Sequence, residues 1–228
     1  MSRESSLLPE IYDRLLQAYG PQHWWPAEEP FEVMVGAVLT QSTAWTNVEK
    51  AIDSLKSAGA LEPAALRRLS LHEVAVLVRS SGFYHVKARK LKALVEWLGA
   101  YRDDLRRLRD RGLPELRREL LGVYGVGEET ADSILLYALD RPVFVIDAYT
   151  RRTVDRIGLA VEPKSYAGYQ ALFMRHLPPD ARLFNEYHAL LVQHGKTTCR
   201  KVPRCPECCL LKVCHYGQAT VKAARVVL

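Results

Sequence analysis

The sequence LLGVYGVGEETA, residues 120–131, places three glycines between two stretches of helical periodicity. Glycine allows positive φ and lets a backbone approach a ligand closely. We expect a helix to begin at about Glu128, so that its free N–H groups and its dipole point out of the turn. Such a turn can bind a phosphate oxygen without reading base sequence. Taken alone, the turn fits an ordinary helical hairpin as well as it fits a phosphate site.

The pattern on both sides of this turn predicts helices almost throughout the chain. Apolar residues recur at helical spacing in five stretches: 31–39, 74–78, 88–98, 116–121 and 183–191. Only residues 143–146 look strand-like, and four residues cannot support a sheet. The predicted class is therefore all-α, with its long loop at 158–165.

Local signals predict where several of these helices begin and end. Ser70 and Glu73 have the spacing of a capping box, and Pro114 suits a first helical turn. Asp180 is expected to cap the helix that follows it. Gly195 is expected to end that helix.

Length and composition limit the possible classes of protein. The 228 residues allow one substantial core or two small lobes, and 48% hydrophobic with 25% charged residues is ordinary for a globular protein. No apolar run approaches the length of a membrane span, and the first residues lack the pattern of a signal peptide. We expect the protein in the cytoplasm.

Positive charge is concentrated in two stretches of the chain. Residues 85–119 hold eleven Lys or Arg against six Asp or Glu, and residues 196–228 hold seven against one. Such asymmetry suits a polyanionic partner. For residues 85–119, a solvated helix face explains the charge equally well.

All five cysteines lie between residues 199 and 214. Such a cluster indicates a metal site rather than disulfides. The spacing Cys199-x5-Cys205-x2-Cys208-x5-Cys214 could hold zinc or a [4Fe–4S] cluster. One compact loop favours iron–sulfur, with zinc as the main alternative. Cys209 is the spare cysteine, because using it would break the Cys-x-x-Cys pair.

Asp147 supplies the second decisive feature, because it ends the run 143–146 twenty residues after Gly127 and precedes a helical stretch. With the hairpin, this resembles the helix-hairpin-helix-Gly-Pro-Asp DNA glycosylases, the endonuclease III superfamily. The resemblance covers nearly the whole chain. It implies a two-lobe helical fold with a C-terminal iron–sulfur loop. Tyr124 stands where many members have proline.

The resemblance implies roles for residues of the hairpin and of the segment after it. Gly125, Val126, Gly127 and Thr130 match the family's DNA-binding hairpin, and Asp147 matches its catalytic aspartate. A carboxylate can stabilise an oxocarbenium-like sugar or deprotonate a water nucleophile. Capping a helix is the alternative role for Asp147, and both roles are compatible.

A lysine that forms a Schiff base in bifunctional members is replaced here by Glu129. A carboxylate cannot form an imine, so the resemblance implies a monofunctional glycosylase. An acidic residue is also favourable in the first turn of a helix.

The cysteine loop is close to that of endonuclease III, which has one more residue in its first gap. The resemblance therefore implies a [4Fe–4S] cluster on Cys199, Cys205, Cys208 and Cys214. Lys196 and its basic neighbours in the loop are then expected to face DNA phosphates.

Base flipping requires residues that fill the gap in the duplex. The segment 39–43 resembles the one from which this family inserts a glutamine, which makes Gln41 the candidate plug. The segment 81–88 resembles the loop that wedges a bulky residue from the minor groove, which makes Phe83 the candidate wedge. Packing in the core is the alternative for Phe83.

The N-terminal aromatic residues resemble the bacterial 3-methyladenine DNA glycosylase III branch, where corresponding residues line the base pocket. They are Trp25 and Trp45, with Pro26 beside Trp25, while Trp24 fits either the pocket or the core. Stacking between indoles suits a cationic alkylated purine. The expected partner is therefore double-stranded DNA containing a damaged base. We expect the protein to bind it as a monomer associated with the nucleoid.

The expected domains are a helical barrel at 28–136, which contains the hairpin, and a cluster domain formed by 1–27 and 137–228. Other enzymatic interpretations are a mismatch thymine or uracil glycosylase and an oxidised-base glycosylase. A non-catalytic DNA-binding module is the interpretation from another class, and Asp147 argues against it.

Overall fold

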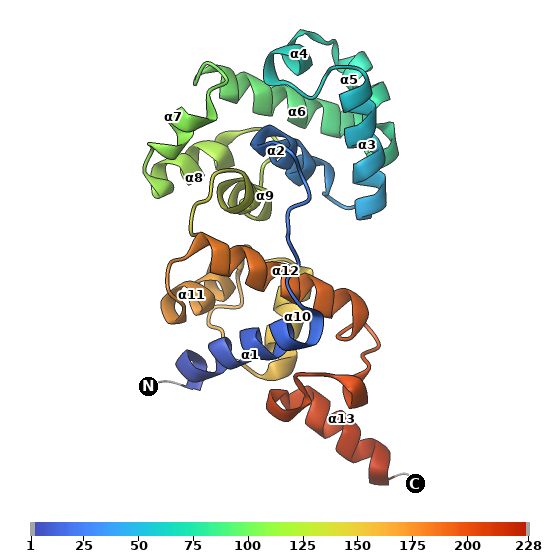
Figure 1. The fold of residues 1–228 in the computed structure, drawn as a ribbon, viewed down its shortest axis with the longest axis vertical. Helices are drawn as coiled ribbons and strands as arrows, with labels where there is room; N and C mark the ends of the chain where they lie inside the picture. The colour runs from blue at the N-terminus through green and yellow to red at the C-terminus, as the bar shows by residue number, and fades with distance from the viewer. Residues whose placement is uncertain (1–2, 227–228) are drawn as a thin grey trace. The chain divides into compact units, whose positions relative to one another are not determined.

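The computed structural model describes residues 3–226, and side chains within 4–224, and this part of the chain contains helices but no strand (Figure 1). The predicted all-α class is confirmed. None of the described helices is both long and apolar enough to cross a membrane. The chain divides into two compact units, residues 25–141 and residues 1–24 with 142–228. The sequence placed the corresponding boundaries at 28 and 136.

The unit of residues 25–141 is built around one buried helix. All residues from Phe31 to Leu39 are buried, and all of them except Glu32 are apolar or glycine. This helix packs against the helices at 45–57, 84–99 and 128–133 and the turn at 134–138. The helices of this unit are α2 (Pro30–Leu39), α3 (Trp45–Ser57), α4 (Pro63–Arg68), α5 (Leu71–Leu77), α6 (Tyr84–Gly99), α7 (Leu105–Arg109), α8 (Leu113–Gly122) and α9 (Glu128–Ser133). A 3₁₀ turn, η1 (Arg79–Ser81), precedes α6, and a π-helical turn, η2 (Ile134–Ala138), continues α9.

Two predicted helix starts are confirmed in this unit. The Ser70 hydroxyl accepts from the Glu73 backbone N–H at 3.2 Å, and the Glu73 carboxylate accepts from the Ser70 N–H at 2.7 Å. This capping box satisfies two N–H groups at the start of α5. Pro114 lies in the first turn of α8, where its missing N–H costs nothing.

The other unit packs the N-terminal helix onto helices from the last third of the chain. Its helices are α1 (Arg3–Tyr19), α10 (Ala148–Ile157), α11 (Tyr166–His176), α12 (Ala181–Thr197) and α13 (His215–Val226), with short turns η3 (Cys205–Glu207) and η4 (Leu211–Val213). Helix α12 contacts both α1 and α10. The buried hydroxyl of Tyr187 on α12 donates to the carbonyl of Leu8 on α1 at 2.9 Å, so this contact ties together segments from opposite ends of the sequence.

The structure corrects one predicted boundary and explains the strand-like run. The expected cap at Asp180 is confirmed, but α12 continues past Gly195 to Thr197. Gly195 serves close packing instead, since a Cβ there would lie 2.5 Å from Cδ1 of Tyr149. Residues 143–146 are buried and lie outside any helix, and the Phe144 ring stacks on Phe173 with centroids 3.9 Å apart. Their apolar character therefore reflects a core segment.

Candidate functional site: hairpin, carboxylate and cysteine loop

The hairpin between α8 and α9 needs one glycine in the left-handed region. Gly125 has φ of 79°, whereas Gly127 caps α9 with φ of −95°. The expectation of positive φ is therefore met at Gly125 and not at Gly127. A Cβ at Gly125 would also lie 2.3 Å from Cγ of Lys90. Val126 is buried and anchors the turn, while Gly127 is exposed at the start of α9.

Gln41, the predicted plug, is hydrogen-bonded to this hairpin. Its amide nitrogen donates to the Gly125 carbonyl at 3.0 Å and to the Thr130 hydroxyl at 2.9 Å. Its amide oxygen accepts from the ammonium group of Lys90 on α6. Lys90 was not predicted as a site residue. Its only sequence signal was its place in the basic stretch 85–119.

Phe83, the predicted wedge, lies on the surface of the same unit. Its side chain is 72% exposed, so packing in the core does not account for it. Its φ of 45° follows Gly82 at 70°, and the chain leaves η1 through these two left-handed residues before α6 begins. This backbone places a large apolar side chain where it can reach a partner.

Trp25, Pro26 and Trp45 line one cavity of about 150 Å³. The two indoles meet edge to face, with centroids 5.3 Å apart and planes at 83°. They therefore cannot sandwich a base between them, which corrects the expected stacking between indoles. Trp25 lies against α2 at Gly36, where a Cβ would come within 3.0 Å of the indole. Tyr137 adds a third ring 5.3 Å from Trp25, which the sequence did not indicate.

Carboxylates make the same cavity acidic. Glu32, Glu49 and Asp53 are among the residues that line it. The Trp45 indole N–H donates to Glu49 at 2.9 Å, which fixes both side chains. Glu32 pairs with Lys56 at 3.1 Å, and this hydrogen bond raises the pKa of Lys56. The cavity thus combines aromatic surface with negative charge.

Glu129 lies exposed in the first turn of α9, beside Glu128. Two carboxylates at a helix N-terminus interact favourably with its dipole. The structure therefore gives this side chain a local electrostatic role at the start of α9.

Asp147 is the N-cap of α10, and its Oδ1 accepts from the Thr150 backbone N–H at 2.7 Å. On α12, Nε2 of the buried His188 lies 3.9 Å from the same oxygen. Burial lowers the pKa of His188, although the charge of Asp147 acts in the opposite direction. A neutral imidazole therefore faces the carboxylate at neutral pH. His188 was missed because its signal exists only once α10 and α12 pack.

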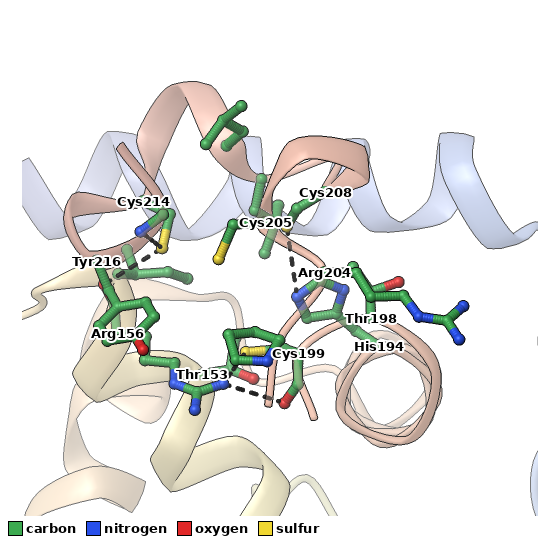
Figure 2. Close-up of a pocket in the computed structure, with 15 residues that line it drawn as sticks. Thr153, Arg156, His194, Thr198, Cys199, Arg204, Cys205, Cys208, Cys214 and Tyr216 are labelled. Carbon is green, nitrogen blue, oxygen red and sulfur yellow. Dashed lines mark hydrogen bonds between the residues drawn. The ribbon is translucent and has the colours of Figure 1, made fainter. Parts of the chain in front are cut away.

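The four cysteines of the predicted motif line one cavity in the unit of residues 1–24 and 142–228 (Figure 2). Cys199, Cys205 and Cys214 are buried, while Cys208 is half-buried. Cys209 is not among the lining residues. Within the described part of the chain, no three His, Cys, Asp or Glu side chains lie close enough to hold a metal ion as they stand. The four thiol side chains that share this cavity are therefore the feature that indicates a metal group.

Hydrogen-bond donors surround these sulfurs. The Cys199 sulfur accepts from Arg156 at 3.3 Å, and the Cys214 sulfur accepts from the Gly217 N–H at 3.3 Å. Burial alone would raise the pKa of Cys199, but hydrogen bonds from His194 and Arg156 outweigh it and lower the pKa to about 7. Burial raises the pKa of Cys205 and Cys214. At Cys199 the donors therefore favour the thiolate, the form that binds metals.

Two arginines of α10 hold the backbone of the cysteine loop. Arg152 donates to the Cys199 carbonyl at 2.8 Å, and Arg156 donates to the Arg200 and Lys201 carbonyls at 2.7 and 3.0 Å. These guanidinium groups therefore serve structure, which the sequence did not indicate. Lys196 lies exposed in the last turn of α12, where a cation suits the helix dipole.

Residues 35–179 match the model of the HhH-GPD superfamily of base excision DNA repair proteins, and the chain belongs to this family. The chain is 43% identical over 210 residues to a candidate DNA repair glycosylase of Methanocaldococcus jannaschii, covering 91% of this chain and 96% of the relative.

Two solved structures extend the likeness to the fold. A 3-methyladenine DNA glycosylase of H. pylori bound to 1,N6-ethenoadenine matches with a TM-score of 0.73 and 27% identity, over 85% of this chain and 97% of that one. A trapped endonuclease III–DNA covalent intermediate matches with a TM-score of 0.81 and 23% identity, over 97% of this chain and all of that one. The protein is thus a DNA repair glycosylase of the HhH-GPD family, with an endonuclease III-like fold.

Proposed function

We propose that this enzyme is a monofunctional DNA glycosylase that hydrolyses the N-glycosidic bond of a flipped alkylated purine, such as 3-methyladenine, in double-stranded DNA. The observation that carries the proposal is the acidic aromatic cavity of Trp25, Pro26 and Trp45. A purine alkylated at a ring nitrogen is a cation and already a good leaving group, so it needs little acid catalysis. Contact with an indole face and nearby carboxylates favours such a base over a neutral one.

The edge-to-face geometry of the indoles indicates how a base would be bound. A base can stack on an indole at the wall of the cavity, while the other ring supports that indole from its edge. Glu49 and Asp53 supply negative charge at the cavity wall. The H. pylori relative, whose structure contains an ethenoadenine, agrees with a pocket for modified adenines.

Asp147 is the proposed catalytic carboxylate. Its Oδ1 is held by the Thr150 N–H, and this hydrogen bond fixes the direction of the side chain. The carboxylate would stabilise positive charge on the sugar, or take a proton from the attacking water. His188 would hold that carboxylate beside a neutral ring.

Glu129 supports the absence of lyase activity, because the position where a lysine would form a Schiff base carries a carboxylate instead. Strand cleavage would then require alkali or a separate lyase. Gly125, Val126, Gly127, Thr130 and the exposed Lys196 are proposed to contact the DNA backbone, Gln41 to fill the vacated space, and Phe83 to act as the wedge.

Cys199, Cys205, Cys208 and Cys214 are the proposed ligands of a [4Fe–4S] cluster. Their shared cavity and the N–H donors around them fit this group. When bound, the cluster would cross-link a loop that has little apolar core of its own. Lys196 at the end of α12 and the basic residues of the loop would then face phosphates.

The test of the activity is single-turnover base release by wild type and by Asp147→Asn. We expect the variant to lose orders of magnitude in rate and to keep its DNA affinity within a few-fold, because charge and base function are lost while phosphate contacts remain. An unchanged single-turnover rate would place the catalytic carboxylate elsewhere.

The test of the substrate uses methylated DNA beside duplexes that carry thymine glycol, mismatched thymine or uracil, and 8-oxoguanine. We expect 3-methyladenine to be released fastest. Faster release of a neutral base would establish a mismatch or oxidised-base glycosylase instead. Borohydride trapping of a covalent adduct with wild type would overturn the monofunctional assignment.

A further inference from the structure

Lys87 on α6 is a buried cation that is not among the residues proposed above to bind DNA or to act in catalysis. It is 2% exposed, and its ammonium group donates to the Leu39 carbonyl at 2.8 Å and to the Ser81 carbonyl at 2.6 Å. Burial lowers its pKa to about 8. Lysine is almost never fully buried without a partner, because desolvation of an ammonium group is costly. Its two carbonyl partners therefore indicate a specific role.

Both carbonyls lie two residues before a residue proposed to enter DNA. Leu39 is the last residue of α2, and Gln41 lies two positions after it. Ser81 is the last residue of η1, and Phe83 lies two positions after it. The Lys87 backbone N–H also donates to the Phe83 carbonyl at 3.0 Å, an ordinary helix hydrogen bond at the start of α6, so Phe83 lies one helical turn before Lys87.

We infer that Lys87 is a positioning residue whose ammonium group joins the two segments that carry Gln41 and Phe83 and sets both side chains as a pair for insertion into the duplex. The inference rests on the proposed function. The carbonyl at the C-terminal end of α2 carries partial negative charge, which suits a cation. One charge shared between two segments couples their positions, because neither carbonyl can move without losing its donor.

Lys92 on the same helix provides a matched control. Its ammonium group donates to the Arg67 carbonyl and, at 2.9 Å, to the Leu69 carbonyl. Those carbonyls lie around the end of α4, away from Gln41 and Phe83 in the sequence. Lys92 thus makes the same type of contact without joining the plug and wedge segments.

The experiment compares binding to two duplexes that differ at one position. One carries a tetrahydrofuran abasic analogue opposite 2-aminopurine, and the other carries an intact pair. We expect wild type to prefer the abasic duplex and to raise the fluorescence of the estranged 2-aminopurine. Lys87→Met should reduce this preference at least about tenfold and abolish the fluorescence change, whereas Lys92→Met should retain both. If circular dichroism shows that Lys87→Met does not fold, Lys87→Gln is tested in its place, and the same losses of preference and of fluorescence change are expected.

A cycle with Phe83→Ala separates positioning from general stability. If Lys87 acts through the plug and the wedge, the losses of preference caused by Lys87→Met and by Phe83→Ala should be less than additive in the double variant. Equal loss of affinity for both duplexes, additive effects with Phe83→Ala, or no abasic preference in wild type would overturn the inference. Base release from methylated DNA tests the glycosylase activity separately, so either conclusion can fail without the other.

Discussion

Asp147 caps a helix with the same carboxylate that is proposed to act in catalysis. The same Oδ1 that caps α10 at 2.7 Å lies 3.9 Å from a buried imidazole. A capped carboxylate keeps a fixed direction, which a catalytic group needs. The helix-capping role of Asp147 is therefore compatible with the catalytic role proposed for it.

The His188 imidazole makes the stability of the protein depend on pH. Its pKa is 6.5 in an unfolded chain and lower in the folded protein, because burial disfavours the charged ring. As pH falls below about 6.5, the unfolded state takes up the proton first, so the free energy of unfolding decreases. Above that pH both states are neutral at this site and the contribution is constant.

We expect urea unfolding to show this pH dependence as a difference in the free energy of unfolding between wild type and His188→Gln. The stability of wild type relative to the variant should decrease between about pH 7.5 and about pH 5, because only wild type carries the titrating ring. A difference that stays constant across this range would mean that the folded imidazole titrates normally.

At the scale of elements, the hairpin depends on an ion pair that holds α8 to α9. Arg117 donates to both oxygens of Asp132, at 2.7 and 3.0 Å, and Asp132 is 0% exposed. The geometry is bidentate, the strong form of this interaction. The turn around Gly125 is thus fixed by its two flanking helices as well as by its own backbone.

Arg117→Met should cost about 3–5 kcal/mol in the free energy of unfolding, because it leaves a buried carboxylate without its main counter-ion. Arg118→Met, an exposed neighbour on the same helix, is the control and should stay within about 0.5 kcal/mol. Chemical denaturation measures both. A loss below about 1 kcal/mol for Arg117→Met would show that water or another cation replaces the guanidinium group.

At the scale of the whole molecule, one of the two units is assembled from both ends of the chain. Helix α1 packs on α11 and α12, and the cysteine loop follows α12. Arg152 and Arg156 connect that loop to α10, the helix that Asp147 begins. A change in the loop can therefore reach α10 through these guanidinium groups.

Substitution of single cysteines should identify the metal group and its ligands. Cys208→Ser should lose bound iron and the brown colour expected of wild type, because it removes a thiolate that lines the cavity. Cys209→Ser should keep both. Iron analysis and visible spectra of protein purified without oxygen provide the measurement. The reverse result would reassign the third ligand, and a colourless zinc-containing wild type would replace iron–sulfur by zinc.

The sequence alone determined the helical class, the hairpin, the capping box at Ser70 and the identity of the cysteine motif. These features depend on residues close together in the chain, so periodicity and spacing are sufficient to reveal them. Tertiary structure decided the contacts of Gln41 with Gly125 and Thr130, the edge-to-face angle of Trp25 and Trp45, and the pairing of His188 with Asp147. It also showed Lys87 between two segments and Gly195 beneath Tyr149. Each of these features joins distant residues, and the packing of whole helices fixes which atoms meet.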